Sequence, residues 1–230
     1  MHTRFLLACV TIAGFLPIAA RAHHGLDFLL VQTAHLPTKG SGYAVARSDR
    51  ISEHHDELEF EPALLFGVTD WMTVELHGHY EKERGESSNY ESVAPALHFR
   101  LTPRGQAFSF GLSAEYEIAH HSEDEDVSEV AAIFGYEASR WVATGNLLYE
   151  KPSGFSGELG YAAGFRHSVG QKHSVGVELL GSFESDGSSE MMVGYYGEFS
   201  ERFSFNAGVG AGIDEGPDRA ARLAFIWQIK

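Results

Sequence analysis

Glutamate and histidine recur at alternate positions in several segments of the chain. One run has glutamate at every second position of 57–61, and another has Glu75, His77 and His79. Because side chains two residues apart lie on the same face of a β-strand, each run would present its polar groups together. Carboxylates attract cations, and imidazole combined with carboxylate suits Zn²⁺ and Cu²⁺. The candidate chemistry is therefore cation passage or metal binding.

Histidine supplies the metal hypothesis. His23 and His24 are adjacent in the sequence, as are the histidines at 54–55 and 120–121. The spacing matches no established zinc motif, so the alternative is that these histidines are polar loop residues or hydrogen-bond to neighbouring glutamates. We expect no cofactor, with Zn or Cu as the alternative. The candidate metal ligands are His77, His79, His98, His23 and His24.

Catalytic motifs are absent from the sequence. It contains no GxSxG, no Walker A and no HExxH segment. A histidine of the 120–121 pair could meet Asp124 or Asp126, but such neighbours arise easily by chance. We expect that the protein is not an enzyme, and a barrel enzyme stays as a minor alternative.

The overall charge is strongly acidic. The 230 residues include 17 Lys plus Arg and 32 Asp plus Glu, which gives a formal net charge of −15. A nucleic-acid partner needs a basic surface, and the sequence offers none. Abundant glycine and aromatic residues with few prolines favour strands and tight turns.

The first 22 residues are typical of a secretory signal peptide. Arg4 supplies the positive charge, an apolar stretch follows over 5–16, and Ala20-Arg21-Ala22 has the small-x-small form of a cleavage site. We predict a signal peptide over 1–22 and one domain over 23–230. Cys9, the single cysteine, would be lost with the signal, so no disulfide is expected.

The rest of the chain alternates with period 2. In 107–118 the even positions include Phe108, Phe110 and Leu112, whereas the odd positions are small or acidic. This pattern predicts β-strands and fits no helix. The predicted strands are 26–36, 56–68, 71–82, 90–102, 107–119, 127–138, 141–151, 155–168, 174–184, 190–200, 203–213 and 219–229, with 37–55 irregular or holding part of a strand.

The lengths of these segments separate a membrane barrel from a soluble one. Soluble strands usually run five or six residues, whereas about ten tilted residues cross the hydrocarbon layer. Short connections also alternate with longer, acidic ones, as expected if periplasmic turns alternate with external loops. We predict an all-β fold, an antiparallel up-and-down transmembrane β-barrel of about twelve strands.

These features together resemble the superfamily of bacterial outer-membrane β-barrel proteins. The last segment, with Leu223, Phe225, Trp227 and Ile229 on one face, resembles the C-terminal signal for outer-membrane assembly, although it ends on Lys230. The resemblance implies location in the outer membrane of a Gram-negative cell. The implied partners are outer-membrane lipid and lipopolysaccharide, the assembly machinery and small solutes, and not nucleic acid.

In such a barrel the polar face of each strand would line the lumen. We expect porin-like passage or binding of small polar or cationic solutes through an acidic lumen. The alternatives are a metal-binding surface barrel for Zn or Cu, a structural barrel with a filled lumen, and a barrel enzyme. The candidate lumen-lining residues are Glu57, Glu59, Glu61, Glu75, Glu115, Glu117, Arg100, Arg166 and Arg222.

Overall fold

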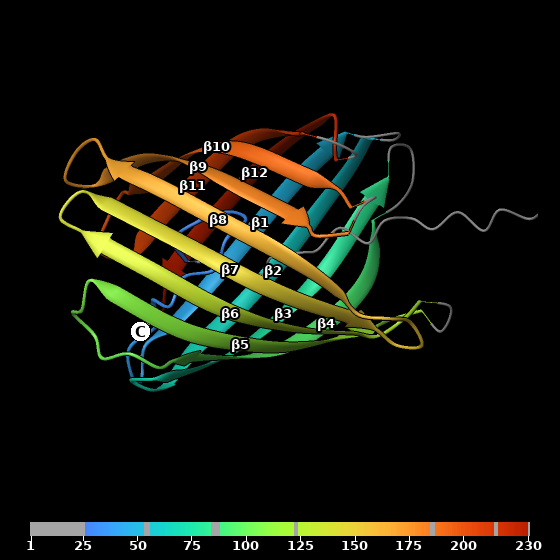
Figure 1. Ribbon diagram of the computed structural model, residues 1–230, viewed down its shortest axis with the longest axis horizontal. Coiled ribbons are helices and arrows are strands. Elements are labelled where there is room, and N and C mark those ends of the chain that lie inside the picture. Colours follow the sequence, from blue (N-terminus) through green and yellow to red (C-terminus); the bar gives the residue numbers. More distant parts are fainter. Residues whose placement is uncertain are drawn as a thin grey trace, which may run out of the picture.

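The chain forms a closed antiparallel β-barrel. The computed structural model describes residues 26–52, 56–83, 88–121, 124–184, 187–213 and 216–229. Twelve strands follow one another around the barrel in chain order, and the first pairs with the last (Figure 1). The predicted all-β, up-and-down architecture is therefore confirmed, and the predicted signal peptide lies outside the described residues.

The strands are long enough to cross a membrane. They have between 10 and 14 residues each, and no helix in the described residues is long and apolar enough to span a bilayer. Their bounds are β1 Gly42–Ser52, β2 Asp56–Thr69, β3 Met72–Glu83, β4 Asn89–Arg100, β5 Phe108–Ala119, β6 Val127–Ala138, β7 Trp141–Pro152, β8 Glu158–Ser168, β9 His173–Ser182, β10 Ser189–Glu198, β11 Phe203–Gly212 and β12 Arg219–Gln228.

The predicted first strand, 26–36, is wrong. Residues 26–41 form no strand, and β1 lies in 37–55, the segment that was predicted to be irregular or to hold part of a strand. Four consecutive apolar residues, Phe28 to Val31, are all buried, so this stretch has no polar face to alternate with an apolar one. β1 was hard to recognise because it carries charges on both faces: Arg47 and Asp49 are buried, while Arg50 is exposed. The other eleven strands begin and end within three residues of their predicted bounds.

The outside of the barrel is apolar. Large hydrophobic side chains at alternate strand positions are exposed, including Leu76, Leu112, Val130 and Leu147, and their neighbours in the strand are buried or half-buried. In water such a surface would be strongly unfavourable, whereas a lipid bilayer accommodates it. The exposed face is therefore that of a barrel that lies in a lipid bilayer.

The two ends of the barrel differ. At one end, here called the turn end, the connections are 70–71, 101–107, 139–140, 169–172 and 199–202. The connections at the other end, the loop end, follow Ser52, Glu83, Ala119, Pro152, Ser182 and Gly212. Figure 1 shows the turn end on the left, together with the C-terminus.

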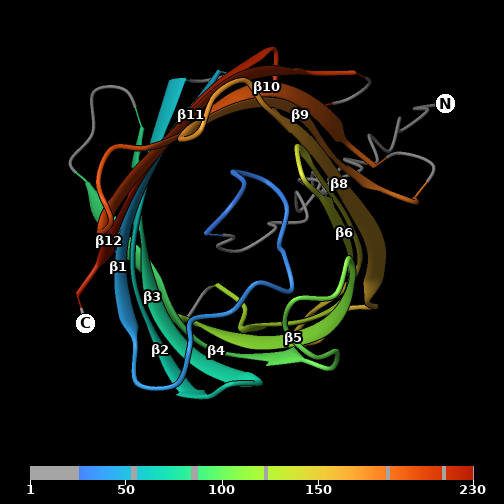
Figure 2. The same ribbon diagram turned by 90° about the vertical axis from the view of Figure 1, so that its left-hand side faces the viewer.

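The segment that precedes β1 lies inside the barrel. Figure 2 looks into the turn end and shows residues 26–41, in blue, within the ring of strands. We call this segment the plug. Gly40, with φ of 82°, turns the chain from the plug into β1, and the N–H of Gly40 donates to the carbonyl of Gly67 on β2 at 2.7 Å. A left-handed backbone of this kind favours glycine.

Candidate functional site: the lumen and its plug

The interior of the barrel is polar where the outside is apolar. Because the barrel is closed, the buried member of each alternating strand pair faces the lumen. Among the candidate lumen-lining residues, the structure buries Glu59, Glu61, Glu75, Arg100 and Arg222, and it half-buries Glu57, Glu115, Glu117 and Arg166. His77, His79 and His98 are also buried, whereas His23 and His24 lie outside the described residues.

An apolar core inside the lumen holds the middle of the plug. Phe28, Leu29, Leu30 and Val31 are each no more than 3% exposed. They pack with wall residues of β6, β7, β8, β9, β10 and β12: Ala131, Ile133, Leu148, Ala162, Leu180, Met192, Tyr196 and Ala224. The wall at these positions is apolar, although most of the interior is polar. This burial stabilises the plug by roughly 25 cal/mol for each square ångström of apolar surface removed from water.

Glu178 binds the backbone of the plug. The N–H of Leu29 donates to its Oε1 at 2.9 Å, and the N–H of Leu30 donates to its Oε2 at 2.6 Å. The hydroxyl of Tyr196 donates to the same carboxylate. The plug has no strand partner of its own, so these contacts satisfy backbone groups that would otherwise be buried without one.

A second polar contact fixes the next turn of the plug. The N–H of Gln32 donates to Oδ1 of Asn146 at 2.8 Å, and the carbonyl of Gln32 accepts from Thr144 and Asn146. Both wall residues belong to β7 and are buried. Nearer the turn end, Arg100 donates to the carbonyl of Ala34 at 3.0 Å. The plug is therefore held through its main chain at successive positions.

A group of four charged residues ties the plug to β6 and β8. Arg166 donates to Oδ1 of Asp27 at 3.0 Å. His35 lies between two carboxylates, with Nδ1 3.0 Å from Oδ2 of Asp27 and Nε2 3.1 Å from Oε2 of Glu137. Burial alone would raise the pKa of Asp27, but Arg166 and His35 hold that pKa below its ordinary value.

The pKa of His35 moves in the opposite direction. Its hydrogen bond to Asp27 raises the pKa, burial opposes this, and the charges of Asp27 and Glu137 raise it further. The protonated imidazole can donate from both ring nitrogens, one to each carboxylate. The group therefore binds the plug most tightly when His35 is charged.

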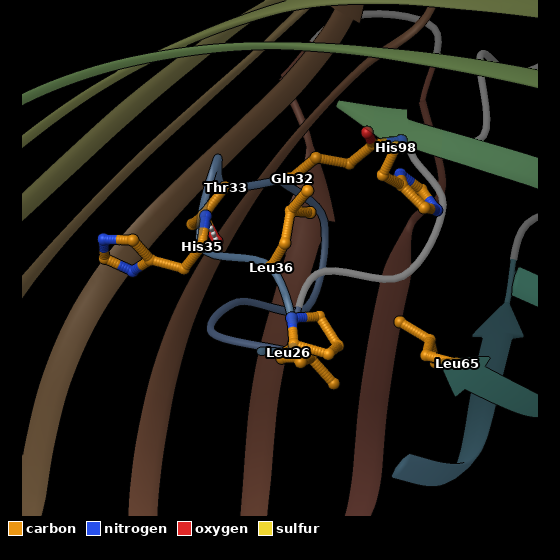
Figure 3. A pocket seen from close by; sticks show the side chains of 8 residues that line it. Leu26, Gln32, Thr33, His35, Leu36, Leu65 and His98 are labelled. Atoms are coloured by element: carbon orange, nitrogen blue, oxygen red, sulfur yellow. Dashed lines mark hydrogen bonds between the residues drawn. The ribbon is translucent and has the colours of Figure 1, made fainter. Parts of the chain in front are cut away.

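The plug packs closely against β2 and β4. The cavity between them is lined by Leu26, Gln32, Thr33, His35, Leu36, Pro37, Leu65 and His98 and has a volume of only about 10 Å³. Figure 3 shows the Gln32 side chain reaching toward His98 while the ring of His35 points to the opposite side of the plug. A volume of this size holds about one water molecule. At the turn end a larger cavity, of about 240 Å³, lies beside β10, β11, β12 and β1.

The wall formed by β2, β3, β5, β6 and β7 is acidic. We call its inward-facing carboxylates, Glu59, Glu61, Glu75, Glu115, Glu117, Glu129 and Glu150, the acidic wall. Three of its members are direct cross-strand neighbours, since Glu115 pairs with Glu129 and Glu129 pairs with Glu150. Like charges in directly opposed positions repel each other. This row gathers acidic groups on one side of the lumen.

Two arginines of β1 and β12 pair with buried carboxylates of the adjoining wall. On β1, Nε and Nη2 of Arg47 both donate to Oδ2 of Asp49, at 2.9 and 2.5 Å. On β12, Arg222 contacts Asp49 and also donates to Glu190 at 2.6 Å. These buried charges form a mutually paired network. The wall near β1 and β12 therefore contains both signs of charge, whereas the acidic wall contains mainly carboxylates.

The candidate histidines lie beside carboxylates of the acidic wall. His98 Nε2 is 2.7 Å from Oε2 of Glu75, and His77 has one ring nitrogen 3.6 Å from Glu75 and the other 3.6 Å from Glu115. The sequence suggested, as an alternative to metal binding, that these histidines pair with neighbouring glutamates. The distances for His77 and His98 are consistent with that alternative. His79 lies instead beside Glu59 and Glu61.

The sequence did not indicate the plug or its binding partners. Nothing in the sequence connected Glu178 to Leu29 and Leu30. The available signal was the unbroken apolar run 28–31 ahead of Pro37, which a membrane strand with a polar inner face would not contain. The suggested pairing of His120 or His121 with an aspartate is also not seen: in the described contacts the ring of His120 packs on Tyr90, and Asp126 accepts from Tyr116.

A closed barrel of membrane-spanning strands, apolar outside and charged inside, defines this protein as an outer-membrane β-barrel. Three solved structures share the fold. An outer membrane channel from Pseudomonas putida F1 is 11% identical, with a TM-score of 0.64 over 85% of this chain and 97% of that one. The KdgM porin is 7% identical, with a TM-score of 0.62 over 82% and 99% of the two chains, and the NanC porin is 7% identical, with a TM-score of 0.62 over 81% and 100%. No family model and no curated protein matches the sequence.

Proposed function

We propose that this protein is an outer-membrane channel for small cationic solutes whose conductance is restricted by the plug. The observation that carries the proposal is the row formed by Glu115, Glu129 and Glu150 across β5, β6 and β7. A mobile cation in the lumen would relieve the repulsion between these carboxylates, whereas an anion would increase it. The similarity in fold to porins supports a channel, and the acidic wall supports the sign of the solute.

The solute class differs from that of one neighbour. The KdgM porin has been solved in complex with oligogalacturonate, which is a chain of acidic sugars. The acidic wall of the present barrel would repel such a polyanion, because the described inward-facing positions of β2, β3, β5, β6 and β7 include carboxylates and no arginine. Amines, basic amino acids and metal ions are the solutes that fit its charge.

Conductance across a planar bilayer tests this proposal. We expect small channels in the wild type, a reversal potential that indicates cation preference, and a severalfold larger conductance after deletion of 26–38. Replacement of Glu115, Glu129 and Glu150 by Gln should remove most of the cation preference. The matched control replaces three carboxylates that do not line the lumen, Glu91, Glu125 and Glu184, and should leave it unchanged.

Two results would contradict the channel. Anion preference in the wild type would refute the assignment of solute charge. No conductance in the wild type and none in the deletion variant, with heat-modifiable mobility showing that both barrels are folded, would favour a structural barrel with a filled lumen.

A further inference from the structure

Three potential metal ligands converge on the inner wall between β2 and β3. Glu59 and Glu61 lie two residues apart on the inward face of β2, and His79 lies on β3, which pairs with that part of β2. One ligand atom from each residue lies within 4.8 Å of the other two. All three side chains are at most 7% exposed. Backbone pairing of two rigid strands therefore brings these ligands together.

The charge of this triad suits a divalent cation. Two carboxylates and one neutral imidazole carry a charge of −2. Arg47 lies beside the triad, with its Nη1 3.6 Å from Oε2 of Glu61. The same guanidinium also donates to Oδ2 of Asp49 through Nε and Nη2. Arg47 is thus shared between carboxylates, and the acidic wall continues beyond the triad with Glu75, Glu115 and Glu129. Burying so many like charges is costly unless cations accompany them.

The donor atoms narrow the kind of metal. Zn²⁺ accepts both carboxylate oxygen and imidazole nitrogen as ligands, whereas Ca²⁺ and Mg²⁺ prefer sites made of oxygen alone. Three protein ligands leave one coordination position for water or a solute from the lumen. Sites with such an open position exchange ligands more readily than closed four-ligand sites do.

We propose that Glu59, Glu61 and His79 form a binding site for a divalent transition metal ion of the Zn²⁺ class on the lumen wall. The site is narrower than the sequence predicted. His98 hydrogen-bonds to Glu75, and His77 is placed between Glu75 and Glu115, so these two histidines lie outside the ligand set. The proposal does not depend on conduction, since a filled barrel with this wall would offer the same three ligands.

Calorimetric titration tests the site. Zn²⁺ alone is added to the metal-free refolded barrel, and the heat of binding is measured. We expect one equivalent to bind, and we expect His79→Ala and Glu61→Gln each to weaken the affinity at least tenfold. His98→Ala is the matched control within the acidic wall, and His120→Ala with His121→Ala is the control for exposed histidines; both should bind as the wild type does. Mg²⁺ should bind more weakly than Zn²⁺.

The proposal has clear failing outcomes. An affinity that is unchanged by His79→Ala, or is reduced as much by His98→Ala, would overturn it. So would a loss of binding confined to a variant that lacks His23 and His24, because the site would then be the chain terminus. If His79→Ala does not refold, Glu59→Gln provides the same test with a smaller change. X-ray absorption at the zinc edge should show a coordination shell of oxygen and nitrogen only.

Discussion

Glu178 has a different task from the other lumen glutamates. Its carboxylate accepts hydrogen bonds from two plug amides and from the hydroxyl of Tyr196, whereas Glu115, Glu129 and Glu150 of the acidic wall are cross-strand neighbours of one another. A carboxylate is suited to this role because both of its oxygens accept and neither donates. One residue type therefore serves two purposes in the same lumen, and only the neighbouring residues distinguish them.

Replacing Glu178 by Gln should loosen the plug. The amide NH₂ would meet a backbone N–H donor, so at least one hydrogen bond to a charged acceptor would be lost, at a cost of about 1.5–3 kcal/mol. Amide hydrogen exchange at Leu29 and Leu30 should accelerate by about 10- to 100-fold. Glu198→Gln, an exposed change on β10, should leave exchange unaltered. Equal protection of the two amides in both variants would show that Glu178 does not hold the plug.

His35 should make the plug sensitive to pH. Because its pKa is raised in the folded protein, the stabilisation it provides is fully present below the ordinary histidine pKa of about 6.5. It is lost as the pH rises through the raised value, since the neutral ring can no longer donate to both Asp27 and Glu137. Exchange of plug amides, corrected for the intrinsic effect of pH, should therefore be slowest in acid. His35→Gln should abolish this dependence, and an unchanged profile in that variant would exclude His35 as its origin.

At the scale of elements, the plug and β2 meet at Gly67. A Cβ at this position would lie 2.2 Å from the carbonyl oxygen of Thr38, far inside van der Waals contact. The absence of a side chain permits the reciprocal hydrogen bonds between Gly67 and the segment 40–41. The end of the plug is thus positioned by one residue of the wall.

Gly67→Ala should displace the plug from β2. The clash involves backbone atoms, which cannot move aside cheaply, so we expect a loss of about 1–3 kcal/mol in the free energy of unfolding. Gly42→Ala is the matched control, because its nearest contact would be an ordinary 3.6 Å. Denaturant unfolding of the two variants in detergent measures the difference, and equal stability would show that the plug adjusts without cost.

The plug also marks the limit of what periodicity can predict. Alternation identified β2 to β12 because each has an apolar face toward lipid and a polar face toward the lumen, as in 107–118. It missed β1, where Ser48 and Arg50 are polar on the outward side of Arg47 and Asp49. It could not place 26–41, since contacts with residues more than a hundred positions away, such as Asn146 and Glu178, leave no local pattern.

For the whole molecule, the apolar exterior implies that a charged residue introduced on the lipid-facing side will destabilise the barrel. Leu147 lies in the middle of β7 and is 47% exposed. Leu147→Arg should destabilise the barrel in a bilayer by about 2–4 kcal/mol, whereas Val169→Arg, in the turn 169–172, should cost about 0–1 kcal/mol. Reversible unfolding in lipid vesicles measures both. Equal effects of the two substitutions would contradict a membrane-spanning exterior.

The global architecture was more predictable than the site. Strand number, order and facing follow from a pattern of period 2, and the predicted lumen positions of Glu59, Glu61 and Glu75 follow from that facing. The register between neighbouring strands determines which glutamate lies beside which histidine. Alternation within one strand gives no information about that register. Glu61 and His79 could therefore be assigned to the same face, but their approach could not be predicted.

The pairing of β1 with β12, from Tyr43 with Gln228 to Ser52 with Arg219, has a consequence for biosynthesis. A polypeptide is made from its amino end, so β1 must wait with one edge unpaired until the eleventh strand after it has arrived. A chain that stops before Arg219 would carry two exposed edges, one on β1 and one on β11, and each is a template for pairing with another chain. A truncated copy would thus be an aggregation-prone sheet rather than a narrower pore. The pairing of the first strand with the last can form only in a chain that includes β12.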